Sequence, residues 1–439
     1  MHITQDLLRA VAIGDLPPRL LVRVGLEHLT ALCPCCEREV AAWKAEASRG
    51  GEVSPGSSLI VPLLAAAAPK IAKAEAQAER DFAELLAMPV EAWQARIARS
   101  RSRFRSPGLV HRLLKASGES LRDNWESAYH LAALALSIAN RSARMFDLHV
   151  LAAAAMGNVC RAQGDLRTAD RHFEYVRFLL HSQDVTDLSV LAEVDDLEGS
   201  LRKDQRRFEQ AVDLLERANA LYRLAGSEER CTKVKVLLAD VHFYRGDSNQ
   251  AISTLVIALR KIRPDSDIHA YLCARHNLAW YLMFGERYEE ALEIFDEDSD
   301  LFALHGHTVW KIRRRWLEGM ISAGLGQPGH AESSLLAARD GFIALALGFD
   351  AAVVSMDLAA FYLRAGRTEE VRNLAEAMIP IFEAQDIHRE ALAALVLFQE
   401  AARREKVTLS FVSRLATYLR EASVDRDLKF RGGDGERIR

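Results

Sequence analysis

The stretch MGNVCRAQGDLRTADRHFEYV (156–176) has apolar residues three and four positions apart on both sides of Gly164. This spacing is typical of two amphipathic helices joined by a short turn. Gly157 stands twelve positions before Ala169, and the large Phe173 follows four positions after that alanine. Because two helices approach closely only where their side chains are short, the stretch predicts a tight helical hairpin.

Three further stretches repeat this order of small residue, turn glycine, alanine and large apolar residue. They are LADVHFYRGDSNQAISTLVIA (238–258), LAWYLMFGERYEEALEIFDED (278–298) and EGMISAGLGQPGHAESSLLAA (318–338). The corresponding helix-start positions are 169, 211, 251, 291, 331 and 371, with spacings of 42, 40, 40, 40 and 40 residues. A constant period of this length indicates a stack of helical hairpins, each packed on its neighbours. Asp298 departs from the pattern, since the other copies have a small or branched apolar residue there.

The pattern resembles the tetratricopeptide repeat over roughly residues 120–380. This resemblance implies a right-handed α-solenoid whose first helices line a concave face. The period exceeds the ~34 residues usual for that repeat, and HEAT-type repeats share the ~40-residue length but lack this spacing. No alternating strand pattern stands out, so we predict an all-α protein.

Composition divides the chain into five segments. We predict a small helical N-terminal domain (1–48), a linker (49–62), connecting helices (63–105), the TPR-like repeat solenoid (106–425) and a polar tail that is disordered (426–439). The linker contains SRGGEVSPGSS (48–58), which is rich in glycine and serine.

Three of the six cysteines fall within HLTALCPCC (28–36). Neutral imidazole and thiolate are the preferred ligands of zinc. His28, Cys33 and Cys36 are therefore candidate zinc ligands, with Cys35 as an alternative to Cys36. The fourth ligand is not identifiable from the sequence. Two other interpretations are a redox pair and three small residues in a buried helix.

The longer stretch HLTALCPCCEREV (28–40) resembles the zinc-associated anti-sigma motif H-x3-C-x2-C of bacterial anti-sigma factors. Here the first gap is four residues instead of three. The resemblance covers about residues 1–48, and it implies zinc at His28, Cys33 and Cys36 and a sigma factor as partner.

First helices of the repeats carry the candidate partner-binding residues. KIRRRW (311–316) begins such a helix, and the preceding repeat places aromatic and amide side chains on the same face. Aromatic anchors and arginines that pair with carboxylates suit a peptide or protein partner. The candidates are Asn158, His276, Asn277, Trp280, Arg313 and Trp316. An alternative for the two tryptophans is packing against the next repeat.

The segment WQARIARSRSRFRSPG (93–108) is strongly basic. Its arginines are Arg96, Arg99, Arg101, Arg103 and Arg105. One interpretation is an anionic partner. The other is a solvated helix whose arginine stems cover apolar surface. Phe104 is the only aromatic residue placed for stacking on bases, which disfavours nucleic acid.

Composition and missing motifs exclude several functions. A net charge of −4 gives the whole chain no bias toward nucleic acid or an anionic membrane. No signal peptide or spanning apolar run stands out, so we expect a cytoplasmic protein. Motifs of phosphate-binding loops, zinc proteases, serine hydrolases and dinucleotide folds are missing in suitable context, so we expect no enzyme.

Together these features predict a regulatory scaffold, of bacterial type, that binds a protein or peptide. Its partner would be a sigma factor or another regulator. Two alternatives stay open: a sensor in which oxidation releases zinc from the cysteines, and the recognition arm of a separately encoded effector enzyme such as a protease.

Overall fold

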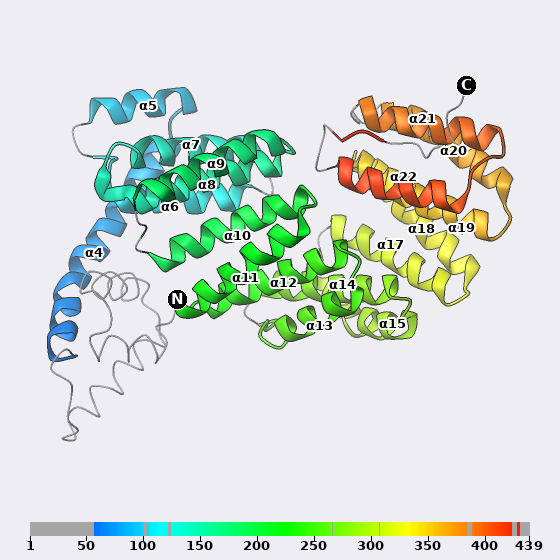
Figure 1. Cartoon of the computed structure of the whole chain (residues 1–439), viewed down its shortest axis with the longest axis horizontal. Helices are drawn as coiled ribbons and strands as arrows, with labels where there is room; N and C mark the ends of the chain where they lie inside the picture. Colours follow the sequence, from blue (N-terminus) through cyan, green and yellow to red (C-terminus); the bar gives the residue numbers. More distant parts are fainter. Residues whose placement is uncertain are drawn as a thin grey trace, which may run out of the picture. The chain divides into compact units, whose positions relative to one another are not determined.

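The computed structural model describes residues 57–100, 103–121, 124–183, 185, 187–265, 267–306, 308–383, 389–423 and 428–430. Side chains are described from residue 72 onward, apart from residues 380 and 382–390. Every regular element within these ranges is a helix (Figure 1). The predicted all-α fold class is therefore confirmed.

The chain divides into two compact units between Leu237 and Leu238. The first unit holds α4 (Ser57–Leu86), α5 (Val90–Arg99), α6 (Pro107–Ser120), α7 (Trp125–Ala139), the 3-10 helix η1 (Ala143–Met145), α8 (Phe146–Ala162), α9 (Leu166–Ser182), α10 (Leu188–Asp204) and α11 (Phe208–Leu224). Helix α12 (Glu228–Tyr244) crosses the division.

The second unit begins with the end of α12. It then holds α13 (Ser248–Leu259), α14 (Ile268–Phe284), α15 (Tyr288–Glu297), α16 (Ser299–His305), α17 (Thr308–Gly324), α18 (Pro328–Ala344), α19 (Gly348–Arg364), α20 (Thr368–Glu383), α21 (Arg389–Arg403) and α22 (Leu409–Ala422). The predicted segment boundaries at residues 48, 62, 105 and 425 stay predictions.

Six helical hairpins follow one another with the predicted period. Their first helices are α8, α10, α12, α14, α17 and α19, which begin at residues 146, 188, 228, 268, 308 and 348. The differences between successive starts are 42, 40, 40, 40 and 40 residues, and each first helix is 17 residues long. This regularity confirms the predicted helical-repeat solenoid.

The two helices of a hairpin approach closely at the predicted small residues. A Cβ atom added at Gly157 would lie 2.7 Å from Phe173 Cε2, and one added at Gly199 would lie 2.8 Å from Leu215 Cδ2. The alanines that open the second helices are fully buried: Ala169, Ala211, Ala251, Ala291 and Ala331. Burial of each facing Phe or Leu side chain contributes about 1.5–3 kcal/mol.

Each hairpin turn contains a residue in the left-handed backbone region, two positions after the first helix ends. In four hairpins it is a glycine with φ between 71° and 93°: Gly164, Gly246, Gly326 and Gly366. In the other two it is Arg206 or Glu286, each with φ of 59°. Gly285 lies in the turn with φ of −82°, so its neighbour Glu286 has the strained conformation. A side chain there costs about 1–2 kcal/mol.

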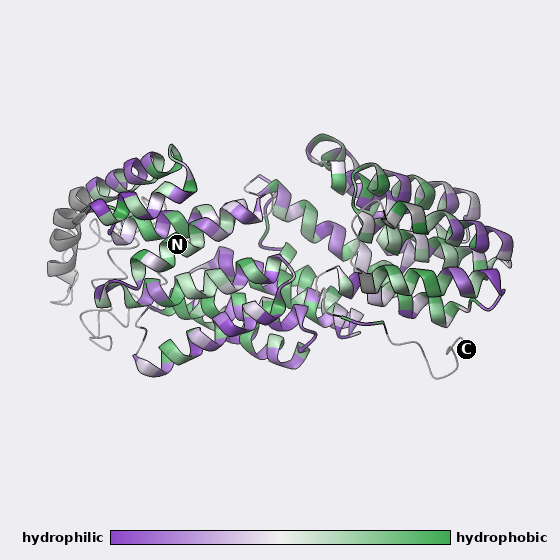
Figure 2. Ribbon diagram, turned by 90° about the horizontal axis from the view of Figure 1, so that it is seen from above, coloured by the Kyte–Doolittle hydropathy of each residue, from purple (hydrophilic) through white to green (hydrophobic). Residues whose placement is uncertain are grey.

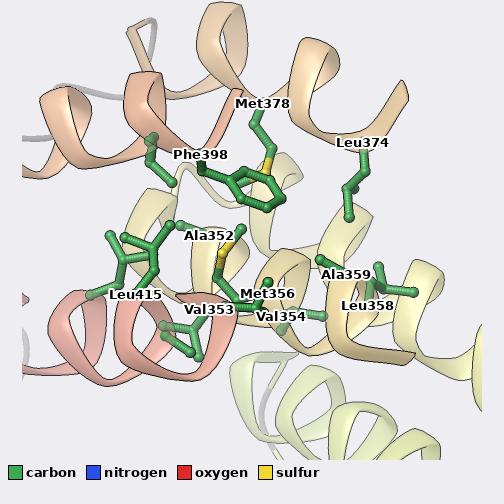
Figure 3. Close-up of a cluster of buried hydrophobic side chains, with 14 of the residues drawn as sticks. Ala352, Val353, Val354, Met356, Leu358, Ala359, Leu374, Met378, Phe398 and Leu415 are labelled. Carbon is green, nitrogen blue, oxygen red and sulfur yellow. The ribbon is translucent and has the colours of Figure 1, made fainter. Parts of the chain in front are cut away.

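Apolar side chains gather between the helices of each unit. Figure 2 shows hydrophobic and hydrophilic residues distributed around the helices, as the 3.6-residue pattern predicts. One large cluster of the second unit joins α17 to α22, and Figure 3 shows Met356, Met378, Phe398 and Leu415 within it. In the first unit, buried residues of α4 to α8 form one cluster around Phe82, Trp93 and Leu113.

The departure at Asp298 marks a break in a second helix. Helix α15 ends at Glu297 and α16 begins at Ser299. The Asp298 side chain is buried and accepts a 2.6 Å hydrogen bond from Arg275 Nε. Burial raises the pKa of this carboxyl, and Arg275 opposes the shift. A buried carboxylate in place of alanine thus needs its own cation.

Candidate functional site

The first helices of the second unit carry five of the six candidate partner-binding residues. Because the period is 40 residues, His276 of α14 and Trp316 of α17 are equivalent positions, and so are Tyr244 of α12 and Phe284 of α14. Asn158 lies on α8 in the first unit. The six predicted residues therefore lie in both compact units, one in the first unit and five in the second.

Trp280 is the centre of an aromatic cluster. Its ring lies 4.8 Å from that of Trp316 in an edge-to-face arrangement, 5.4 Å from Phe284 and 6.1 Å from His276. Such pairs contribute about 0.5–1.5 kcal/mol each beyond the area that they bury. Trp280 keeps part of its side chain exposed, so a partner can reach it.

Trp316 belongs to the core. Only 7% of it is exposed, and its ring packs edge-to-face on Phe342 at 6.2 Å. Its Nε1 donates a 2.9 Å hydrogen bond to Asp357 Oδ2. The sequence left both roles open for this residue, and the geometry favours a positioning role behind Trp280.

His276 lies half-buried between the rings of Trp280 and Phe302, the latter at 6.3 Å. Burial, together with the positive charges of Arg313 and Arg314, lowers the pKa of His276 to about 3. The imidazole is therefore neutral at physiological pH. It offers a partner an aromatic surface and a polar nitrogen but no charge.

The two predicted asparagines already have partners within the protein. Asn277 Nδ2 donates to Asp240 Oδ1 at 3.3 Å, and the hydroxyl of Tyr281 also donates to that oxygen. Asn158 Oδ1 accepts a 2.9 Å hydrogen bond from Arg161 Nε. These bonds hold each side-chain amide in one orientation. A peptide backbone could therefore bind only to the remaining hydrogen-bond donors and acceptors of that amide.

The arginines of KIRRRW differ in role. Arg313 has a side chain that is 47% exposed, and it pairs with Asp350 at 3.4 Å. Arg314 turns inward, where its guanidinium lies 3.6 Å from the centre of the Phe295 ring and 4.7 Å from that of Phe302. Arg313 is thus the one of these two whose charge a partner can reach.

Sequence reasoning missed three aromatic residues near Trp280: Phe284, which contacts it, Phe243, which contacts Phe284, and Tyr244, which contacts Phe243. Phe243 lies stacked on Tyr281 at 4.6 Å, and it contacts Phe284 edge-to-face at 5.3 Å. Tyr244 and Phe284 are 47% and 40% exposed. We call Phe243, Tyr244, Trp280 and Phe284 the aromatic surface. The 40-residue spacing between Tyr244 and Phe284 was the available signal, since it places both at one position of successive first helices.

The basic segment packs against acidic residues of α4. Arg96 donates to Glu84 Oε1 at 2.7 Å, and Arg103 donates to Asp81 Oδ1 at 2.7 Å. Both guanidinium groups lie over the buried ring of Phe104, at 5.0 and 4.7 Å. Hydrogen bonding to Arg96 lowers the pKa of Glu84. This geometry favours the interpretation as a packed helix.

The two other described arginines of that segment, Arg99 and Arg105, differ from this arrangement. Arg99 is exposed, and Arg105 is half-buried with an Nε atom that has no hydrogen-bond partner. Arg101 lies outside the described residues, as do all the candidate zinc ligands: His28, Cys33, Cys35 and Cys36. The zinc site thus stays a prediction. Among the described cysteines, Cys160 is buried, and burial raises the pKa of its thiol to about 11.

Among the helices of the described residues, none combines the length and the apolar character that a bilayer crossing requires.

No model of a known protein family matches the sequence, and no curated protein matches it. Several solved structures are similar in fold. A Rap protein complexed with Competence and Sporulation Factor has 13% identity and a TM-score of 0.54, covering 72% of this chain and 89% of that chain. The apo form of RapI has 13% identity and a TM-score of 0.52, covering 73% and 88%.

Aspartyl phosphate phosphatase F from Bacillus subtilis covers 88% of this chain and 91% of its own length, with 13% identity and a TM-score of 0.49. At these identities the comparison with the two Rap proteins of higher TM-score shows the fold alone. The chain is an all-α helical-repeat protein of the tetratricopeptide-like class.

Proposed function

We propose that the protein is a regulatory adaptor that binds a segment of another protein through the first helices α12, α14 and α17. One observation carries the proposal: the aromatic surface is partly open, with Tyr244 and Phe284 almost half exposed and one repeat apart. Large aromatic side chains on a surface are the usual anchors of protein interfaces.

The surroundings of the aromatic surface suit a peptide segment. Trp316 and Tyr281 are buried behind it and hold Trp280 and Phe243 in place. A rigid aromatic anchor loses little conformational freedom on binding, which favours affinity. The exposed charge of Arg313 can pair with a carboxylate of the partner. The Rap protein complexed with Competence and Sporulation Factor gives a precedent for this fold with a bound factor.

As such an adaptor, the protein would act by binding and would catalyse no reaction. Its effect on a pathway would come from holding a regulator or from presenting it to an effector enzyme encoded separately. The sequence alternatives of a sigma factor as partner and of a zinc-dependent redox sensor rest on residues 28–36, outside the described range. They are tested by measuring zinc in the purified full chain and in the variant His28→Ala.

The test places a photo-crosslinking amino acid at Tyr244 in the native host and identifies the protein captured there. The affinity of the captured protein is then measured for the purified wild-type chain, for the variant Phe284→Ala and for the control variant Leu304→Ala. Leu304 is 76% exposed on α16, outside the aromatic surface. We expect Phe284→Ala to raise the Kd about tenfold, or about 1.4 kcal/mol. We expect Leu304→Ala to leave it within about twofold. Equal affinities for all three proteins would reject this surface as the binding site.

A further inference from the structure

The last helix, α22, breaks the packing rule of the array. In the hairpins α17–α18 and α19–α20 the second helix packs on the first helix that precedes it in the chain. Helix α22 instead packs mainly on α19, with few contacts to its chain neighbour α21. Figure 1 shows it beside α19, drawn in red. The chain therefore returns to an earlier first helix instead of extending the stack.

Helix α22 covers positions of α19 other than the equivalents of the aromatic surface, since those equivalents, Ala360, Leu363 and Arg364, are partly or fully exposed. Val353 and Met356 of α19 are 3% and 0% exposed, and they share a buried cluster with Leu415 of α22 (Figure 3). Forty residues earlier stand Arg313 and Trp316. Trp316 is also buried, at 7% exposed, so the contrast is with Arg313, whose side chain is 47% exposed.

The buried positions of α22 are those of an amphipathic helix. Phe411, Val412, Leu415, Ala416, Tyr418, Leu419 and Ala422 are all less than 9% exposed. They recur three and four residues apart, as expected for a helix that lays one apolar face on a surface. Arg414 and Thr417 lie on the exposed side. Helix α22 thus has the chemistry of a helical ligand.

A polar connection ties α22 to the aromatic surface. Arg420 Nη2 lies 3.4 Å from both carboxylate oxygens of Asp357, which also accepts the hydrogen bond from Trp316 Nε1. Burial raises the pKa of Asp357, and the charge of Arg420 opposes this shift. The same guanidinium lies 5.9 Å from the centre of the Phe284 ring. A ligand on Phe284 would therefore meet Arg420 at the edge of its site.

We propose that α22 is an internal ligand of the first helix α19. It covers Val353 and Met356 of α19, leaves Tyr244 and Phe284 of the aromatic surface open, and must be displaced by a partner that extends from the aromatic surface along the first helices. The ion pair of Arg420 with Asp357 holds α22 in place. Without this pair, α22 dissociates from α19 more often. That α22 competes with a partner rests on the proposed function. That α22 binds reversibly to α19 does not rest on it.

The first experiment needs no partner. A fluorescent peptide of residues 405–423 is titrated into the full chain, the variant Arg420→Ala and the control Arg414→Ala, and anisotropy is recorded. Loss of one partly exposed ion pair of about 1.4 kcal/mol would raise the open fraction, and with it the apparent affinity for the peptide, about tenfold. The control should bind as the wild type does, and a peptide with Leu415→Asp should not bind.

Hydrogen exchange of the same variants provides the second measurement. We expect Arg420→Ala to lose protection in α22 alone, with α17, α18 and α20 unchanged. Loss of protection throughout these helices, or equal peptide binding by wild type and Arg420→Ala, would show that α22 is an integral part of the core and would overturn the proposal.

A partner identified by crosslinking at Tyr244 tests the competition. Higher affinity for Arg420→Ala than for wild type supports it, and unchanged affinity refutes it. The two proposals can fail separately. Partner affinity that is insensitive to Phe284→Ala rejects the proposed function, whereas the peptide and exchange experiments decide the seating of α22 alone.

Discussion

At the scale of single residues, His276 shows how packing changes the chemistry that a sequence offers. A histidine beside arginines was predicted as part of a mixed aromatic and basic patch. In the structure its ring lies among Trp280 and Phe302, and burial removes its charge. The sequence identifies a histidine at this position. It does not predict the protonation state of that histidine, because the state depends on residues of three helices.

This burial predicts a pH dependence of stability. The folded-state pKa of His276 is lowered from 6.5 to about 3, so the unfolded chain binds a proton that the folded chain does not. The neutral ring contributes fully to the free energy of unfolding above the pKa of 6.5 that His276 has in the unfolded chain. This contribution is lost as the pH falls from 6.5 toward 3. The slope is at most about 1.4 kcal/mol per pH unit for one proton. Urea unfolding of wild type and His276→Gln should therefore give a stability difference that shrinks from pH 7 to pH 4.

The comparison of two variants isolates this one residue, because all carboxylates titrate in both proteins. A stability difference that stays constant over this pH range would show that His276 keeps an ordinary pKa in the folded state.

At the scale of elements, the sequence predicted the hairpins and their period because both rest on local rules. Short residues must face large ones, and the chain must turn after each helix. It did not predict which residue of a turn is strained, as Glu286 beside Gly285 shows. It also marked Asp298 as a departure without indicating a helix break. The helix break involves a side chain that reaches over from the next repeat.

Arg314 of α17 is the side chain that reaches into the broken helix. Its Nη2 donates to the carbonyl oxygen of Phe295 and, at 2.6 Å, to Ser299 Oγ. The break between α15 and α16 leaves that carbonyl without its usual helical partner. Packing on the rings of Phe295 and Phe302 adds to the interaction. Ser299 Oγ donates to the same carbonyl at 3.3 Å, so Arg314 shares this role and in addition links two repeats.

We expect Arg314→Met to destabilise the second unit by about 1–2 kcal/mol, since a part-buried carbonyl loses its charged donor and the Phe295 ring loses its cation. The neighbouring Arg313→Met should cost less than about 0.5 kcal/mol, because its ion pair is exposed. Chemical denaturation of both variants makes the comparison, and equal losses would mean that Arg314 does not stabilise the break.

At the scale of the whole molecule, the repeat array has mostly local contacts. Apart from the pair α19 and α22, the helix pairs with the most extensive contacts are close in sequence. The stability of such an array is approximately a sum of repeat and neighbour terms, so a disturbance spreads over few repeats. Sequence reasoning reached this architecture, but the return of α22 to α19 is a long-range contact without a periodic signal.

Locality predicts the reach of a single core substitution. In Gly199→Ala the new Cβ would lie 2.8 Å from Leu215 Cγ, so the hairpin α10–α11 must adjust, at about 1–3 kcal/mol. Hydrogen exchange should then show less protection in α8 to α11 and none lost in α19 to α22. Gly118→Ala is the matched control, because its Cβ would have no neighbour within 4 Å and alanine favours the helix. Equal loss over all helices in Gly199→Ala would instead identify the chain as one cooperative block, in which displacement of α22 could not stay local.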